Sequence, residues 1–248
     1  MKKALTPFQS LTRFEKGLYI ASLVTVSAAF LLSRSNDILT LIASLIGATA
    51  LIFVAKGYVL GQILTVVFSL FYGVISFYFR YYGEMITYLG MTSPIAALAV
   101  ISWLRHPYEE TAEVEVSRMT KRQIAAMLSS AAVVTVIFYF ILKALGNANL
   151  AFSTVSVTTS YLASYMTLCR SPFYAVGYAA NDIVLIILWV LASMEDASYV
   201  PMVACFVIFF INDSYGFFNW QRMKKRQCPG KKRREDASKP IAVTPQID

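Results

Sequence analysis

The side chains best suited to binding a small molecule lie inside otherwise apolar segments of this 248-residue chain. The final apolar run, residues 199–220, carries a group of polar and aromatic side chains near its end: Asn212, Asp213, Tyr215, Asn219 and Trp220. Carboxylates and carboxamides are costly to place in hydrocarbon, and those that persist usually face a cavity, a partner helix or a substrate path. This run therefore indicates a membrane protein with a polar interior.

Two earlier segments, residues 59–79 and 173–194, also present polar and aromatic side chains at steps of three and four. Residues at this spacing share one face of a helix. Three helices thus offer such faces to a common interior. We take the following residues as candidate substrate contacts: Gln62, Thr65, Ser69, Tyr72, Asn181, Asp182, Trp189, Asn212, Asp213, Tyr215, Asn219 and Trp220.

The chemistry of these side chains favours a particular kind of ligand. Aromatic rings stack on planar rings, while carboxamides and carboxylates form hydrogen bonds with hydroxyl and amide groups. No Lys or Arg lies deep in the three predicted helices, so nothing there would neutralise a phosphate. The composition favours an uncharged or cationic, planar, hydroxyl-bearing solute over a nucleotide.

Each polar face also has a structural interpretation. The recurring Ser and Thr of residues 150–169 are best explained by close packing between helices. Gln62 and Thr65 could form hydrogen bonds between helices instead of binding a ligand. Asp182 and Asp213 are more costly to bury, which favours a functional role for them over a purely structural partner.

Catalytic and metal chemistry find little support in the sequence. The single histidine, His106, lies at the end of an apolar run, and the three cysteines lack the paired spacing of a zinc site. Neither an H-E-x-x-H nor a G-x-S-x-G motif is present. We therefore expect no catalytic residue, no metal and no cofactor. An intramembrane enzyme and a structural subunit stay open as alternative classes.

Composition predicts an all-helical protein that crosses the membrane about eight times. Hydrophobic residues make up 57% of the chain and charged residues 15%, below the roughly 25% charged share of soluble domains. Period-2 alternation is absent, and most apolar segments are close to the about 20 residues that a helix needs to cross a bilayer. These segments are residues 17–33, 38–55, 59–79, 85–104, 124–144, 150–169, 173–194 and 199–220.

The placement of Lys and Arg predicts that both termini face the cytoplasm. The opposite side then keeps only Arg34, Arg80 and Lys143. The net charge of +8 is thus a topology signal, and we expect a small solute and the lipid bilayer as partners, with no nucleic acid. The first apolar run ends without a cleavage pattern, which favours a helix over a signal peptide.

Two blocks of three predicted helices, residues 38–105 and 150–222, share one order of features. In each block the first helix ends at a basic turn, an acidic turn follows the second, and the third ends on Trp-x-Arg. An odd number of crossings per block and one linking helix between them make the repeats parallel. The remaining parts are residues 1–37 with an extra helix, residues 106–149 with a loop and the linking helix, and residues 223–248 as a basic, disordered tail.

The motifs of these blocks resemble the PnuC family of nicotinamide riboside transporters. The resemblance covers roughly residues 38–222 and is carried by these strings: Tyr82-Gly83-Glu84-Met85, Ile101-Ser102-Trp103, Asn181-Asp182-Ile183-Val184-Leu185, Leu188-Trp189 and Asn212-Asp213-Ser214-Tyr215-Gly216-Phe217-Phe218-Asn219-Trp220. It implies two three-helix bundles joined by a linking helix, as in SWEET transporters, and a homotrimer in the bacterial inner membrane.

The same resemblance implies facilitated diffusion of nicotinamide riboside, which phosphorylation in the cytoplasm would trap. Asn181 and Trp189 match positions expected to meet the nicotinamide and the ribose, and Asn219 and Trp220 match the closing motif. Relatives that carry thiamine, riboflavin or deoxynucleosides share the fold, so the solute stays open. A proton-coupled symporter that uses Asp182 and Asp213 is a further alternative.

Overall fold

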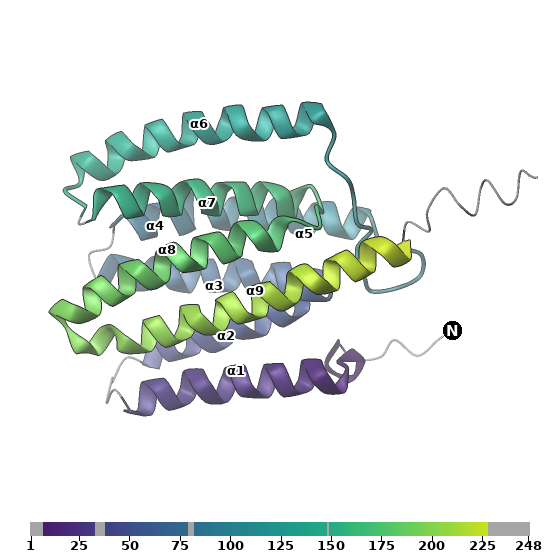
Figure 1. Ribbon diagram of the computed structural model, residues 1–248, viewed down its shortest axis with the longest axis horizontal. Helices are drawn as coiled ribbons and strands as arrows, with labels where there is room; N and C mark the ends of the chain where they lie inside the picture. Colours follow the sequence, from purple (N-terminus) through teal and green to yellow (C-terminus); the bar gives the residue numbers. More distant parts are fainter. Residues whose placement is uncertain (1–6, 33–37, 79–81, 148, 228–248) are drawn as a thin grey trace, which may run out of the picture.

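The computed structural model describes residues 7–32, 38–78, 82–147 and 149–227, and these residues are almost entirely helical (Figure 1). The only β-structure within them is two isolated bridges near the loop after α5. The α-helices are α1 (Arg13–Leu32), α2 (Ile38–Ala55), α3 (Val59–Tyr78), α4 (Tyr82–Thr87), α5 (Ser93–Arg105), α6 (Lys121–Ala144), α7 (Leu150–Leu168), α8 (Tyr174–Glu195) and α9 (Val200–Gln227).

Seven helical stretches of the described chain are long and apolar enough to cross a membrane, with α4 and α5 counted together. The helix α7 is not one of the seven, because Ser and Thr recur along it and lower its hydropathy. It nevertheless runs beside α6 and α8 along the same axis (Figure 1). The predicted all-α membrane fold with about eight spanning helices is thus confirmed.

Six helices form a closed ring. The ring order is α2, α3, α5, α7, α8 and α9, and α9 packs back against α2. On the outside of the ring, α6 packs against α7 and α1 packs against both α2 and α9 (Figure 1). The first block therefore contributes three consecutive ring members and the second block the other three, which leaves the ring interior between the two blocks.

The first helices of the two blocks, α2 and α7, end in the same hydrogen-bonded turn. After α2 the amides of Gly57 and Tyr58 donate to the carbonyls of Val54 and Phe53, both at 2.9 Å. This pattern, with a left-handed residue just past the helix, is the Schellman motif. Gly57 has φ +70°, the conformation that glycine adopts without strain.

The turn after α7 repeats this pattern with Arg170 in the left-handed position, at φ +56°. The amides of Arg170 and Ser171 donate to the carbonyls of Thr167 and Met166, again at 2.9 Å. In backbone geometry, Arg170 of the second turn therefore corresponds to Gly57 of the first. An alignment of the two turns by charge would instead match Arg170 with Lys56, one residue earlier. Non-glycine residues rarely adopt positive φ, so the surrounding contacts must hold this turn in place.

The last helices of the two blocks cap the first helices of the opposite blocks. Trp220 of α9 donates through Nε1 to the Val54 carbonyl of α2 at 2.9 Å. Trp103 of α5 donates to the Thr167 carbonyl of α7 at 3.0 Å. Both indole rings are buried, and their centroids lie 5.5 Å apart. The tryptophan of each Trp-x-Arg motif thus caps a helix of the other repeat. We call this reciprocal capping the exchange between the repeats.

The residue before each tryptophan takes part in the same exchange. Asn219 Nδ2 donates to the Ala55 carbonyl at 2.8 Å, and Ser102 Oγ donates to the Leu168 carbonyl at 3.1 Å. The carbonyls at the end of a helix have no partner within the helix. Asn219 and Ser102 therefore supply donors to the Ala55 and Leu168 carbonyls. The two indoles add a second hydrogen bond to the Val54 and Thr167 carbonyls, which also accept from the amides of Gly57 and Arg170.

The loop between the blocks also joins both turns. The amide of Val114 donates to the Gly57 carbonyl at 2.8 Å, and the amide of Ser117 donates to the Arg170 carbonyl at 3.0 Å. Gln227 at the end of α9 binds this loop through both its side-chain oxygen and nitrogen. Since α9 is held in this way, it continues to Gln227, so residues 223–227 of the predicted tail are helical. Residues 228–248 lie outside the described part of the chain.

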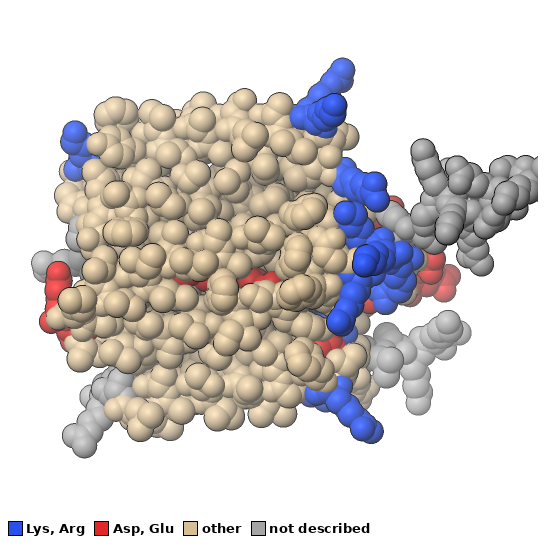
Figure 2. All heavy atoms as spheres, in the orientation of Figure 1, with Lys and Arg blue, Asp and Glu red and all other residues tan. Residues whose placement is uncertain are grey.

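Lys and Arg gather at the end of the molecule where α1 begins and α9 ends, and most of the belt between the two ends lacks charge (Figure 2). We call this end the basic end. Lys143, near the end of α6, lies at the opposite end. Arg34 and Arg80, the other two cations expected there, fall outside the described residues.

The exchanged caps predict similar structural roles for the two tryptophans. Trp103→Phe and Trp220→Phe each keep an aromatic ring but remove the N–H donor from a buried carbonyl. We expect each to lower the free energy of unfolding by about 1–2 kcal/mol, as measured by denaturation of the detergent-solubilised protein. If Trp220→Phe abolished solute uptake without changing stability, Trp220 would be a substrate contact and the cap would not be its main role.

Candidate substrate-binding site

A central cavity of about 60 Å³ lies inside the ring, lined by residues of α2, α3, α7, α8 and α9 and of the segment between α4 and α5. Its polar lining consists of Gln62, Thr65, Ser69, Tyr88, Thr92, Ser160, Tyr178, Asn181, Asp182 and Asp213. Its apolar lining includes Phe68, Phe206 and Phe209. Six of the candidate substrate contacts therefore meet in one cavity: Gln62, Thr65, Ser69, Asn181, Asp182 and Asp213.

Small residues allow the helices to approach closely around this cavity. A Cβ on Gly61 of α3 would lie 2.3 Å from the Val54 backbone nitrogen of α2. A Cβ on Gly177 of α8 would lie 2.9 Å from the Cα of Ala163 in α7. Glycine at such crossings is the usual means of bringing membrane helices together. The polar faces of α3 and α8 are thereby held against the ring interior.

A single π-helical turn, Tyr88–Thr92, joins α4 to α5. Pro94 follows it, and since proline has no N–H to donate to the fourth carbonyl before it, a regular helix is unfavourable here. Such wider turns are frequent at functional sites. This turn places Tyr88 and Thr92 in the cavity lining. Sequence reasoning missed both, because it assumed one regular helix over residues 85–104.

Asn181 lines the cavity, and two hydroxyl groups of α7 hold its side-chain amide in place. The Asn181 Oδ1 accepts hydrogen bonds from Ser156 Oγ at 3.1 Å and from Thr159 Oγ1 at 3.0 Å. With its oxygen occupied, the amide offers its NH₂ group, a donor, to a ligand. Ser156 and Thr159 thus fix the orientation of this candidate residue.

Asp182 of α8 and Asp213 of α9 face each other across the interface of these two helices. Both side chains are buried, with 4% and 3% of their surface exposed. Asp182 Oδ2 has no hydrogen-bond partner among the described residues. The described lining of the cavity contains no Lys or Arg. The pair is therefore an acceptor site, suited to hydroxyl and amide donors or to a cation.

Two further candidates lie toward the end opposite the basic end. Trp189 lines a second cavity of about 110 Å³, together with Glu84 and Ser153. Tyr72 packs against Tyr88, with 4.4 Å between ring centroids, in a hydrophobic cluster that also contains Trp189. Aromatic side chains therefore fill the space between the outer cavity and the central one.

The other four candidates, all on α9, contact neighbouring helices outside the central cavity. Asn212 Nδ2 donates to Ser22 Oγ of α1 at 2.9 Å. Tyr215 donates to Glu15 at 2.8 Å, while Asn219 and Trp220 cap α2. Spacing correctly placed Asn212, Tyr215 and Asn219 on one face. The sequence could not show that this face meets α1 and α2, whereas Asp213 faces the centre.

Besides Tyr88 and Thr92, the lining includes Ser160 and Tyr178, which were not among the candidate contacts. The signal for Tyr178 was present, since it lies one helical turn before Asn181 and Asp182 on the same face. Ser160 lies in the Ser- and Thr-rich face of α7 that the sequence assigned to helix packing. One side chain can serve both purposes at an interface that borders a cavity.

Comparison with known proteins identifies the family. The model of the family described as nicotinamide mononucleotide transporter matches residues 37–222. The chain belongs to this transporter family. The match includes α2 to α8 and most of α9, and it leaves α1 outside.

Among the described residues, no group of three or more His, Cys, Asp or Glu side chains could hold a metal ion.

Individual relatives agree with this assignment. The chain is 25% identical over 224 residues to a nicotinamide riboside transporter PnuC of Neisseria mucosa, an alignment that covers 88% of this chain and 85% of that protein. A crystal structure of the vitamin B3 transporter PnuC superposes with a TM-score of 0.77 at 25% identity, and covers 89% and 95% of the two chains. The predicted PnuC resemblance and the predicted role as a membrane transporter, not an enzyme, are thus confirmed.

The close crossing of α2 and α3 predicts a strong effect at Gly61. A methyl group in Gly61→Ala would meet backbone atoms that cannot move aside, and overpacking of this kind costs about 1–3 kcal/mol or more. We expect a lower midpoint of thermal unfolding in detergent. The matched control is Gly17→Ala in α1, where nothing lies within 4 Å of the added carbon. An equal effect at both positions would contradict close packing at Gly61.

Proposed function

We propose that this transporter takes up nicotinamide riboside by facilitated diffusion. The observation that carries the proposal is the central cavity, which combines the Asp182–Asp213 pair with Asn181 and contains no Lys or Arg in its described lining. The nicotinamide ring of the riboside is a pyridinium cation, and its carboxamide and ribose hydroxyls provide donors. Carboxylates and an amide complement these groups.

The same cavity argues against a phosphorylated substrate. The mononucleotide that gives the family its name carries a phosphate, which would meet two buried carboxyl groups and no cation to neutralise it. Burying an unpaired charge is strongly unfavourable. The riboside is therefore the better fit, and its phosphorylation inside the cell would prevent it from leaving by the same route.

We infer that the basic end faces the cytoplasm of a bacterial inner membrane. The enrichment of Lys and Arg at this end follows the rule that cytoplasmic loops carry the positive charge. Both α1 and α9 have their outer ends there, which would place both termini inside. From the family resemblance, we also propose that the protein forms a homotrimer.

The size of the cavity favours alternating access. Small-molecule sites usually measure about 300–1,000 Å³, and 60 Å³ is far below this range. We therefore interpret the structure as a closed state, in which entry of the riboside would require the two three-helix blocks to move apart. The exchanged caps join the blocks at the basic end, so we propose that the blocks rock about these contacts.

Uptake into proteoliposomes tests the proposed substrate. We expect saturable uptake of labelled nicotinamide riboside that unlabelled riboside inhibits and that nicotinamide mononucleotide does not. Thiamine, riboflavin and a deoxynucleoside serve as competitors for the alternative solutes. The proposal fails if no riboside uptake occurs, or if the mononucleotide competes as well as the riboside does.

A second candidate is proton-coupled uptake, which the adjacent Asp182 and Asp213 favour because two neighbouring carboxyl groups can hold and release a proton. An imposed pH gradient across the proteoliposome membrane separates the two mechanisms. Facilitated diffusion predicts equal accumulation with and without the gradient. Accumulation above the external concentration only with the gradient would establish symport.

The carboxyl pair gives a specific mutational prediction. Asp182→Asn keeps the shape of the side chain but removes one carboxyl group from the pair, and loss of a hydrogen bond that involves a charged group costs about 1.5–3 kcal/mol. We expect KM for the riboside to rise about tenfold or more, from initial uptake rates. Asn181→Ala should act in the same direction. Glu110→Gln, an exposed loop position, is the matched control. An unchanged KM in Asp182→Asn would remove the pair from the site.

A further inference from the structure

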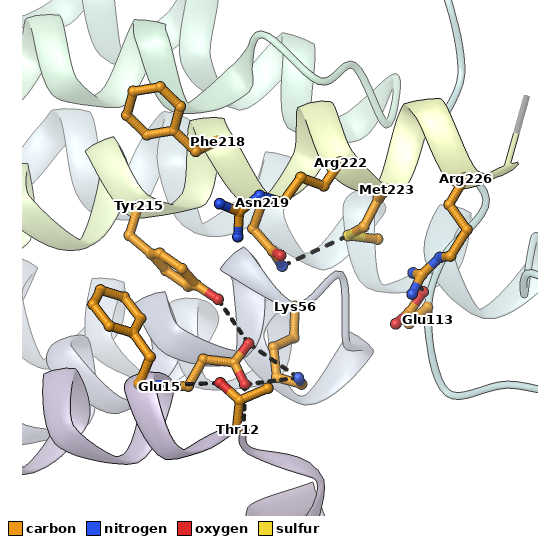
Figure 3. Close-up of a pocket in the computed structure, with 11 residues that line it drawn as sticks. Thr12, Glu15, Lys56, Glu113, Tyr215, Phe218, Asn219, Arg222, Met223 and Arg226 are labelled. Carbon is orange, nitrogen blue, oxygen red and sulfur yellow. Dashed lines mark hydrogen bonds and ion pairs between the residues drawn. The ribbon is translucent and has the colours of Figure 1, made fainter.

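A larger cavity, of about 680 Å³, opens at the basic end between the start of α1, the end of α2 and the last turns of α9 (Figure 3). Its volume lies within the usual range of small-molecule sites. Several of its residues fall outside the segment that matches the family, including Thr12, Glu15 and Arg226. The complete lining is Thr12, Phe14, Glu15, Lys56, Glu113, Tyr215, Phe218, Asn219, Arg222, Met223 and Arg226.

The helix α9 supplies one wall of this cavity. Its 28 residues extend for about 42 Å, longer than the about 30 Å of bilayer hydrocarbon. The last turns of α9 therefore stand at or beyond the headgroup level. Phe218, Arg222 and Arg226 follow at steps of four and lie on one face toward the cavity.

Two of the three cations in this cavity are neutralised. Lys56 Nζ lies 3.0 Å from Glu15 Oε2, and Tyr215 donates to the other oxygen of this carboxylate. Arg226 forms an ion pair with Glu113 (Figure 3). Arg222 has no ion pair among the described residues. The lining therefore has a net charge of +1, and Arg222 carries it.

The position of Arg222 leaves its guanidinium accessible. Arg222 is exposed, and in Figure 3 its side chain extends along α9 in the direction of Tyr215. Phe14 and Phe218, 65% and 62% exposed, stand at the cavity margin. A planar cation with five N–H donors next to aromatic surface is suited to a phosphate that carries an apolar or aromatic group.

We propose that this cavity is a phosphate-binding site, with Arg222 as the principal ligand and Arg226 and the Thr12 hydroxyl as further donors. Two sources share this chemistry: a soluble nucleoside phosphate from the cytoplasm and the headgroup of an anionic lipid. Basic pockets between helices on this side of a membrane are known lipid headgroup sites. The site is separate from the central cavity, so it does not depend on which solute is transported.

Binding to the full-length protein tests the proposal in two arms. The soluble arm uses protein in an uncharged detergent and follows thermal unfolding during titration with adenosine monophosphate, with adenosine as the probe that lacks phosphate. The lipid arm uses nanodiscs and native mass spectrometry, and compares retention of phosphatidylglycerol with that of phosphatidylcholine. A response to adenosine monophosphate identifies a soluble phosphate, and selective retention of phosphatidylglycerol identifies a lipid.

Two variants of the same helix make the test specific. Arg222→Gln removes the unpaired charge, and Lys225→Gln removes one charge from an exposed position of α9 that does not line the cavity. We expect Arg222→Gln to weaken binding about tenfold in the arm that responds, and Lys225→Gln to leave it unchanged. Arg222→Lys should retain part of the binding.

The proposal is overturned if the wild-type protein responds in neither arm. It is equally overturned if adenosine binds as well as its phosphate, or if Lys225→Gln reduces binding as much as Arg222→Gln. An Arg222→Gln protein that unfolds at the wild-type temperature without ligand shows that the loss of binding is not a loss of fold.

Discussion

The carbonyls at the ends of α2 and α7 lie where two membrane blocks meet, and water cannot readily reach them. An unsatisfied carbonyl in such a place costs several kcal/mol. The opposite block supplies donors to them: Asn219 and Trp220 of α9 for α2, and Ser102 and Trp103 of α5 for α7. The closed ring depends on this exchange, because it fixes the last helix of one repeat on the first helix of the other. The two indoles, tilted against each other, fill the space where the exchanges meet.

The blocks are joined in this way at the basic end, and other polar side chains lie further along the ring, on its inner face. They line a small central cavity. The described lining of that cavity contains two acidic residues, Asp182 and Asp213, and no basic residue. In a medium of low dielectric constant, this imbalance would make the proposed site discriminate strongly between solutes of different charge.

The helix α1 adds a second layer of polar contacts outside the ring. Glu15, almost fully buried, binds Lys56 of the turn after α2 and Tyr215 of α9, and Ser22 binds Asn212. These contacts bridge helices from both blocks, as the tryptophan caps do. The polar residues of α9 are therefore divided between two faces: Asp213 faces the central cavity, and the others contact α1 and α2.

Much of this arrangement follows from the sequence alone. Apolar segment length determined the spanning helices, and spacing within residues 173–194 correctly placed Asn181 and Asp182 on one face. The motif order identified the parallel repeat and the PnuC resemblance. These features are local, because helix length and the periodicity of side chains depend only on the chain near each residue.

Only the tertiary structure decided which neighbour each face meets. The sequence grouped Asn212, Tyr215, Asn219 and Trp220 with the substrate contacts, whereas all four bind or cap other helices. It also missed Tyr88 and Thr92, since a π-helical turn before Pro94 changes the direction in which they point. A buried polar side chain signals that a partner exists, and its identity depends on the rotation and packing of helices that are distant in the chain.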